Sequence, residues 1–166
     1  MADVAWLYRS SIYRAVFPRM LRLFVPAHVR LYRLFRGRLV GRLSQGFAPL
    51  LLLTTVGQSS GRRRTQLVGY LRDGPAFLIV GANGGLSSDP GWVFNLRARP
   101  EAEVQVGGER IHVRAAILIG DDHARAWREV TGRYPFFAVY QGVVRRSIPI
   151  VRLDPEPSAL SSELSR

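Results

Sequence analysis

The chain has 166 residues, a length that fits one domain with short extensions, and 47% of them are hydrophobic, as in an ordinary globular protein. It contains no cysteine, which excludes disulfide bonds and any cysteine-based metal site or nucleophile. The formal net charge is +12, and all 24 basic residues are arginine, a side chain suited to two-pronged contacts with phosphate and carboxylate groups.

Much of the positive charge lies in an N-terminal arm, residues 1–47, where nine arginines accompany a single acidic residue. Two triplets in the arm are spaced to occupy opposite faces of a helix: Arg30, Arg33 and Arg36 on one face, and Leu31, Leu34 and Phe35 on the other. Two interpretations of this basic amphipathic helix stay open. It lies on an anionic membrane surface, or it packs on the protein's own core with its arginines in water.

No stretch of the sequence stays apolar over the roughly 20 residues that a membrane-spanning helix requires. Arginines also interrupt the N-terminal region too often for a signal peptide. We therefore expect a cytoplasmic protein, peripheral at the inner face of the membrane if the arm binds lipid.

Residues 48–153 are predicted to form the main domain, with elements in the order β-β-β-α-β-β-α-α-β. The predicted strands are 50–56, 65–71, 76–81, 102–106, 109–119 and 148–153, and the predicted helices are 91–98, 121–133 and 136–144. Asp89 is expected to cap the first helix, and Gly107-Gly108 fits a two-residue hairpin turn. Mostly antiparallel neighbours with inserted helices favour an α+β or barrel fold. Residues 154–166 predict a flexible tail.

The segment from Thr54 to Thr65 is the first candidate for chemistry. A strand runs into a loop bounded by Gly57 and Gly61, with two serines between them, and leaves through three consecutive arginines. Glycine permits turns whose amides converge on an anion, and serine and arginine add donors and charge. The pattern fits a phosphate or polycarboxylate ligand. A hairpin loop with solvated arginines is the alternative, and from composition alone it is the commoner case.

Three further segments carry groups suited to a flat ring ligand. The glycine-rich run 81–85 follows a strand end and would let such a ligand approach the backbone. Trp92 and Asn95 share a helix face, where an indole could stack and an amide could hydrogen-bond. Tyr134 and Tyr140 carry phenols that can donate a proton. The alternative for each is structural: an ordinary glycine turn, or aromatic rings packed in the core.

Together these segments resemble the deazaflavin-dependent nitroreductase family over residues 48–153. The motifs that carry the resemblance follow the family's order: residues 51–62, Tyr70-Leu71-Arg72-Asp73-Gly74, Gly84-Gly85, Asp89-Pro90-x-Trp92-x-x-Asn95-Leu96, Ala98-x-Pro100 and Ser147-Ile148-Pro149-Ile150. Any one motif is weak, but the ordered set is fairly specific. The resemblance implies a mainly antiparallel six-stranded split β-barrel, similar to the flavin-binding split barrels. It also implies a reductase that transfers a hydride from coenzyme F420.

The resemblance further implies which residues form the site. The implied cofactor-binding residues are Gln58, Ser59, Ser60, Arg64, Thr65, Gln66, Leu67, Val68, Gly69, Gly81, Ala82, Asn83, Gly91, Trp92 and Asn95. The first four would hold the phosphate and acidic tail, the next five would line its path, the following three would lie beside the deazaflavin ring, and the last three would close over it. Tyr134, Phe137 and Tyr140 would surround the substrate, with the two tyrosines as candidate proton donors.

The chain departs from the family pattern near the expected ring site. Ala82-Asn83 stands where members often have Ser-Lys, and Phe137 stands where a Tyr is frequent. These changes bear on nitroreduction more than on cofactor binding, so the expected substrate is a quinone, a nitroaromatic or another conjugated electrophile.

Other interpretations of the sequence stay open beside this one. They are a split barrel that binds flavin mononucleotide, and a non-catalytic basic protein of a membrane surface. A nucleic-acid partner is not expected, because the excess charge lies mainly in the arm and no nucleic-acid motif occurs. No metal site is expected, because the three histidines lack ligand spacing.

Overall fold

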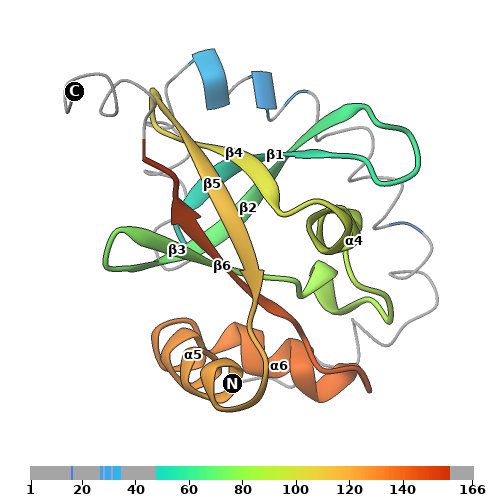
Figure 1. The fold of residues 1–166 in the computed structure, drawn as a ribbon. Helices are drawn as coiled ribbons and strands as arrows, with labels where there is room; N and C mark the ends of the chain where they lie inside the picture. The colour runs from blue at the N-terminus through green and yellow to red at the C-terminus, as the bar shows by residue number, and fades with distance from the viewer. Residues whose placement is uncertain (1–15, 17–26, 28, 31, 35–47, 158–166) are drawn as a thin grey trace.

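A computed structural model describes residues 16, 27, 29–30, 32–34 and 48–157. Its six strands close into one antiparallel barrel in the order β1-β2-β3-β6-β5-β4, and β4 pairs back to β1 (Figure 1). This confirms the predicted six-stranded antiparallel barrel with inserted helices.

The elements follow the predicted order along the chain. The strands are β1 (Leu50–Val56), β2 (Arg63–Asp73), β3 (Ala76–Val80), β4 (Glu101–Val106), β5 (Glu109–Ile117) and β6 (Ile150–Pro155). The helices are the short 3-10 helix η1 (Asn83–Gly85), α4 (Gly91–Ala98), α5 (Gly120–Arg133) and α6 (Phe136–Val143). The sequence did not predict η1. Strand β6 also runs into the expected tail, because Asp154 and Pro155 pair with Arg114 and Val113 of β5.

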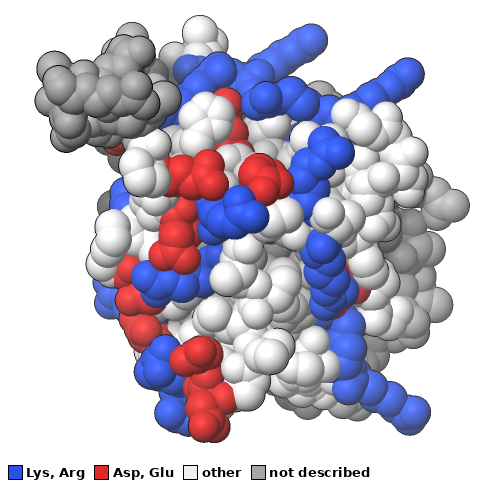
Figure 2. Space-filling view, in the orientation of Figure 1, with Lys and Arg blue, Asp and Glu red and all other residues white. Residues whose placement is uncertain are grey.

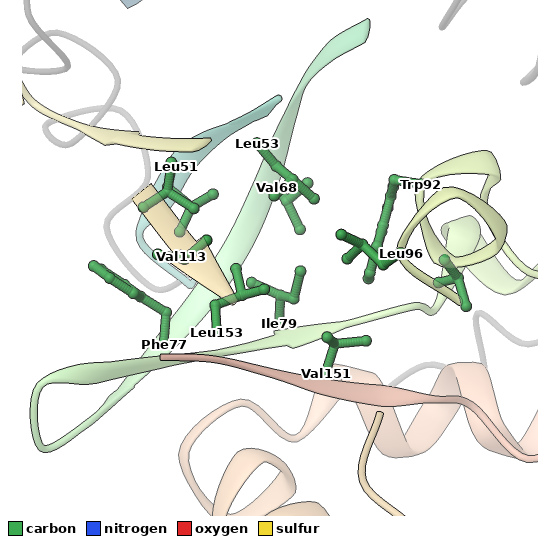
Figure 3. Close-up of a cluster of buried hydrophobic side chains, with 12 residues drawn as sticks. Leu51, Leu53, Val68, Phe77, Ile79, Trp92, Leu96, Val113, Val151 and Leu153 are labelled. Carbon is green, nitrogen blue, oxygen red and sulfur yellow. The ribbon is translucent and has the colours of Figure 1, made fainter. Parts of the chain in front are cut away.

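The barrel interior is filled by apolar side chains from alternate positions of the strands. Leu51 and Leu53 of β1 meet Phe77 and Ile79 of β3, and all four are fully buried (Figure 3). Period-two alternation sends these residues inward because successive side chains of a strand point to opposite faces. Each such side chain stabilises the fold by about 1.5–3 kcal/mol when it leaves water.

The outer surface of β3 and β6 is covered by the two C-terminal helices, which lie below these strands in Figure 1. Leu78 of β3 and Ile150 of β6 pack in one apolar cluster with Val130 of α5 and Phe137 of α6. Apolar residues thus occupy both faces of β3, which explains why its five residues are all buried.

The outer surface of β1 is covered by helical residues of the N-terminal arm. Val29 and Tyr32 pack on Leu52, while Arg30 and Arg33 are exposed. The Tyr32 hydroxyl donates to the carbonyl of Leu50 at 3.0 Å and accepts from the amide of Gly107 at 3.1 Å. For these residues the arm packs on the protein's own barrel.

The predicted apolar face of the arm was wrong in one described position. Leu34 is 76% exposed, whereas Val29 and Tyr32 are buried. Periodicity could not show that the tyrosine hydroxyl has backbone partners on the barrel, and these partners select the buried face. The other predicted members of the two faces, Leu31, Phe35 and Arg36, lie outside the described residues.

Candidate functional site

Three segments gather at one end of the barrel, on the right in Figure 1. They are the β1–β2 loop (57–62), the connection 81–90 that contains η1, and helix α4. Because β3 runs antiparallel to β2, the chain leaves β3 at the end where β2 begins. The sequence motifs that are far apart along the chain are brought together here.

The β1–β2 loop is a tight turn closed by its own backbone. The amide of Gly57 donates to the carbonyl of Arg62 at 2.9 Å, and the amide of Gly61 donates back to the carbonyl of Gly57 at 2.8 Å. A Cβ on Gly57 would lie 2.7 Å from the Ser60 hydroxyl and 3.2 Å from Nε of Arg64. The missing side chain therefore lets Ser60 and Arg64, two of the predicted anion-binding residues, converge over the loop.

Helix α4 is tied to this loop by a buried amide. Asn95 accepts from the backbone amide of Gln58 at 3.0 Å through Oδ1 and donates to the Thr55 hydroxyl at 2.9 Å through Nδ2. Asn95 and Thr55 are 7% and 1% exposed. Asn95 thus has an internal function, which is to set the position of Gln58.

The connection after β3 has an unusual backbone. Asn83, Gly84 and Gly85 have φ values of 50°, 61° and 75°, in the left-handed region that glycine and asparagine tolerate best. The Asn83 side chain stabilises the turn by donating to the carbonyl of Ser88 at 3.0 Å. A Cβ on Gly81 would approach Cγ of Pro149 to 2.7 Å, so Gly81 allows close packing against the segment before β6.

Arg146 binds this connection from the segment between α6 and β6. Its Nη2 donates to the carbonyls of Gly81 and Ala82 at 3.0 and 3.1 Å, and its Nε donates to the carbonyl of Leu86 at 3.3 Å. Its Nη1 forms an ion pair with Asp89 at 2.7 Å. Burial lowers the pKa of Arg146, and the charge of Asp89 partly opposes that change.

The prediction of Asp89 as a helix cap was therefore wrong. Pro90 is the N-cap of α4, and no side chain caps it. The carboxylate of Asp89 instead pairs with Arg146 and, at 3.0 Å, with Arg97. Sequence reasoning also missed Arg146, although it directly precedes the Ser147-Ile148-Pro149-Ile150 motif. The two partners are 57 residues apart, and no local pattern links them.

The predicted cofactor path along β2 has two different sides. Val68 is 8% exposed and belongs to the barrel core, as does Trp92 of α4 at 4% (Figure 3). Their side chains point into the barrel, so Val68 would line the predicted path with its backbone. The burial of Trp92 favours the alternative of core packing for this residue. Thr65 and Leu67 lie on the other side, where the Thr65 hydroxyl meets that of Thr54 at 2.9 Å and Leu67 packs beside the arm.

The predicted substrate residues lie near the far part of this path. A narrow pocket on the outside of β2 and β3, without room for a water molecule, is lined by Gly69, Val80, Tyr134 and Phe137, among others. Tyr140 is the next aromatic residue along α6, with its ring 6.4 Å from that of Phe137. The structure therefore brings Tyr134 and Phe137 together beside Gly69 of β2. Tyr140 lies against η1, where a Cβ on Gly85 would be 3.2 Å from its ring. Gly91 lies at the exposed start of α4.

The end of the barrel is also strongly basic. Figure 2 shows basic side chains running down the right side of the molecule, where Figure 1 has α4 and the β1–β2 loop, whereas acidic and basic side chains mix on the left. In the part of the chain that the structure describes, Arg62, Arg64, Arg99 and Arg145 have no ion-pair partner, while most other arginines of the barrel do. Unpaired cations at one end create a field that attracts anions.

Comparison with known proteins adds a family to this geometry. The family model for F420H(2)-dependent quinone reductases matches residues 24–155. An F420H(2)-dependent quinone reductase from Mycobacterium tuberculosis is 38% identical over 143 residues, which cover 84% of this chain and 93% of that protein.

Two solved structures share the fold and part of the sequence. An F420-H2 dependent reductase has a TM-score of 0.59 and 30% identity, and the match covers 64% of this chain and 94% of that one. A chain described as a domain-swapped dimer has a TM-score of 0.59 and 28% identity, and that match covers 72% of this chain and 96% of its own.

Proposed function

The chain belongs to the family of F420H(2)-dependent quinone reductases, and from this we propose that it binds F420 at the basic end of its barrel and reduces a quinone. The observation that carries the proposal is the convergence of Ser60 and Arg64 over a glycine turn, beside arginines that have no acidic partner among the described residues. The matching family and the mycobacterial relative are named for F420, and neither name supports flavin mononucleotide as the cofactor.

The residues at this end fit the parts of F420. Its phosphodiester and glutamate tail need cations and hydroxyl or amide donors, which Gln58, Ser59, Ser60 and Arg64 would supply. Gly69 would line the path to its flat ring, and residues 81–83 would lie beside the ring. Ala48 and Pro149 already pack on Gly69 and Gly81, so the ring would meet the backbone of Ala82 and Asn83. Thr65, Gln66 and Leu67 would lie along the path between them.

When bound, reduced F420 supplies a hydride, and the protein residues position the electrophile and handle the proton. Tyr134, Phe137 and Tyr140 would form an apolar wall beside an aromatic substrate. Phe137 is 7% exposed, so only the edge of its ring would contact that substrate. Tyr134 and Tyr140 would donate a proton to the reduced product through their phenol groups.

A quinone suits this wall better than a nitro compound. Ala82 and Phe137 place a methyl group and a plain ring where a hydroxyl group and a phenol would otherwise bind a nitro group. Reduction of nitroaromatics or other conjugated electrophiles is the broader form of the same proposal.

The test is the oxidation of reduced F420 by menadione, followed through the absorbance of the deazaflavin, with a nitroaromatic compound as the second acceptor. We expect turnover with the quinone and less with the nitro compound. The double variant Tyr134→Phe, Tyr140→Phe should lower kcat by roughly 10²-fold or more while leaving F420 affinity nearly unchanged. Unchanged kcat would exclude the phenols as the acids, and no turnover with any acceptor would contradict the proposed reaction.

The outward face of the arm supports a peripheral membrane position as a further part of this proposal. Arg30, Arg33 and Leu34 are exposed, a combination of cations and an apolar side chain that binds anionic lipid surfaces. No helix among the described residues is long and apolar enough to cross a membrane. Sedimentation with anionic vesicles should fall when both arginines are replaced by glutamine, and equal sedimentation would exclude this role.

A further inference from the structure

We propose that Arg146 is a positioning residue that fixes the backbone of residues 81–86 and thereby orients two amide donors for the deazaflavin ring. The inference rests on the function proposed above, and it assigns a role to a residue outside the predicted site.

The geometry of the peptide units carries the first step. Arg146 binds the carbonyl oxygens of Gly81 and Ala82 with the same nitrogen, at 3.0 and 3.1 Å. In a trans peptide unit the carbonyl and the following amide point in opposite directions. The amides of Ala82 and Asn83 are therefore directed away from Arg146.

These two amides have no acceptor among the residues that the structure describes. The neighbouring amides are used: Gly81 donates to Pro149, Gly85 to Ala82 and Leu86 to Asn83. A buried backbone donor without a partner is costly, and Ala82 is only 4% exposed. A ligand with carbonyl oxygens on a flat ring, such as a deazaflavin, would supply the missing acceptors.

The backbone at this point needs an external support. Three successive residues, Asn83 to Gly85, are in the left-handed region. Two backbone bonds, from Gly85 to Ala82 and from Leu86 to Asn83, close this turn. Left-handed backbone is costly, so side-chain contacts are needed to stabilise the turn further. Arg146 makes contacts at both ends of the turn, at Gly81 and at Leu86, where its Nε lies 3.3 Å from the carbonyl oxygen.

Arg146 is itself held in place on two sides. Asp89 binds Nη1 at 2.7 Å, and the two side chains are only 16% and 12% exposed. Gln141 of α6 donates to the Arg146 carbonyl at 2.8 Å and accepts from the amide of Ile148 at 3.0 Å. Arg146 thus connects the ring position to α6, the helix that carries Phe137 and Tyr140.

Two variants of Arg146 separate the shape of the guanidinium from its charge, and a third variant serves as the control. Arg146→Gln removes both, and Arg146→Lys keeps the charge but cannot reach three carbonyls with a planar fork. Arg97→Gln is the matched control, because Arg97 also pairs with Asp89 but binds no backbone carbonyl among the described residues. Each variant is measured by amide hydrogen exchange without cofactor and by titration with F420.

We expect exchange at residues 81–86 to accelerate by at least about tenfold in both Arg146 variants, while the barrel strands keep their protection. The Kd for F420 should rise about tenfold in both, and the emission spectrum of bound F420 should shift. Arg97→Gln should stay within about twofold of the wild type. If Arg146→Gln does not fold, Arg146→Lys carries the test.

Wild-type affinity in a folded Arg146→Gln protein would overturn the inference and leave the proposed function standing. Full rescue by Arg146→Lys would overturn it too, because charge rather than fork geometry would then account for the effect. If the wild-type protein itself does not bind F420, the proposed function fails, and the assignment of these amides to a deazaflavin ring fails with it.

Discussion

The interior of the barrel and its basic end are built in different ways. The interior is a continuous apolar cluster that includes Leu53, Phe77 and Leu153, and its cohesion comes from burial alone. The end is held by single polar side chains, above all Asn95 and Arg146, each of which binds backbone groups of a distant segment. The first region sets stability through many interchangeable contacts, and the second sets the shape of a site through a few specific ones.

The comparison predicts its largest effect for a core substitution. Leu153 is fully buried and lies opposite Phe77 in the β3–β6 pair. Leu153→Ala should lower the free energy of unfolding by about 2–5 kcal/mol, because it removes buried methyl groups and leaves a cavity. Denaturant unfolding measures this loss. The folded variant should bind F420 nearly as the wild type does, and a large loss of affinity would show that core and site are not separable.

Asn95→Ala should affect both properties. It leaves the Thr55 hydroxyl and the Gln58 amide without partners, which costs about 1–3 kcal/mol of unfolding free energy. We also expect F420 affinity to fall roughly tenfold, because Gln58 is released.

Thr55→Val is the control for this prediction. It removes one hydroxyl and keeps the bond between Asn95 and Gln58, so it should lower stability but preserve affinity. Equal losses of affinity in Asn95→Ala and Thr55→Val would contradict the positioning role of Asn95.

The smallest effect concerns the contact between the arm and the barrel. Tyr32→Phe removes the hydroxyl that bonds to Leu50 and Gly107 and should cost about 1 kcal/mol. Burial raises the pKa of Tyr32 above its ordinary value of 10.0, an effect that the bond from Gly107 partly offsets and the nearby Tyr70 slightly increases. The folded state thus favours the protonated phenol.

The direction of the pH dependence follows from that shift. Because the folded pKa is the higher one, the contribution of Tyr32 is complete below pH 10 and is lost as pH rises from 10 through the folded pKa. The difference in unfolding free energy between the wild type and Tyr32→Phe should therefore be constant below pH 10 and shrink above it. A difference that grows above pH 10 would contradict this account.

The same contrast explains how far the sequence could predict the structure. The strands were predictable because short apolar runs such as 50–56 and the turn residues between them are local signals, and Gly107-Gly108 fits one kind of turn. The sequence did not predict that the side chains of Val68 and Trp92 point into the barrel, because their direction depends on how α4 closes the barrel.

The polar contacts were the least predictable part. Asp89 fits a helix cap by its local pattern, yet it pairs with Arg146 at a separation of 57 residues. The buried face of the arm, which includes Tyr32 and excludes Leu34, likewise depends on carbonyl and amide groups of the barrel. A sequence read without its contacts shows the candidate residues but not which of them bind one another.

The most direct test of the central claim is a fluorescence titration of the purified protein with oxidised F420, beside one with flavin mononucleotide. The account predicts saturable binding of F420, weakened roughly tenfold in Arg64→Ala, and no comparable binding of the flavin. Binding of neither cofactor, or tighter binding of the flavin, would contradict the claim that the basic end of this barrel is an F420 site.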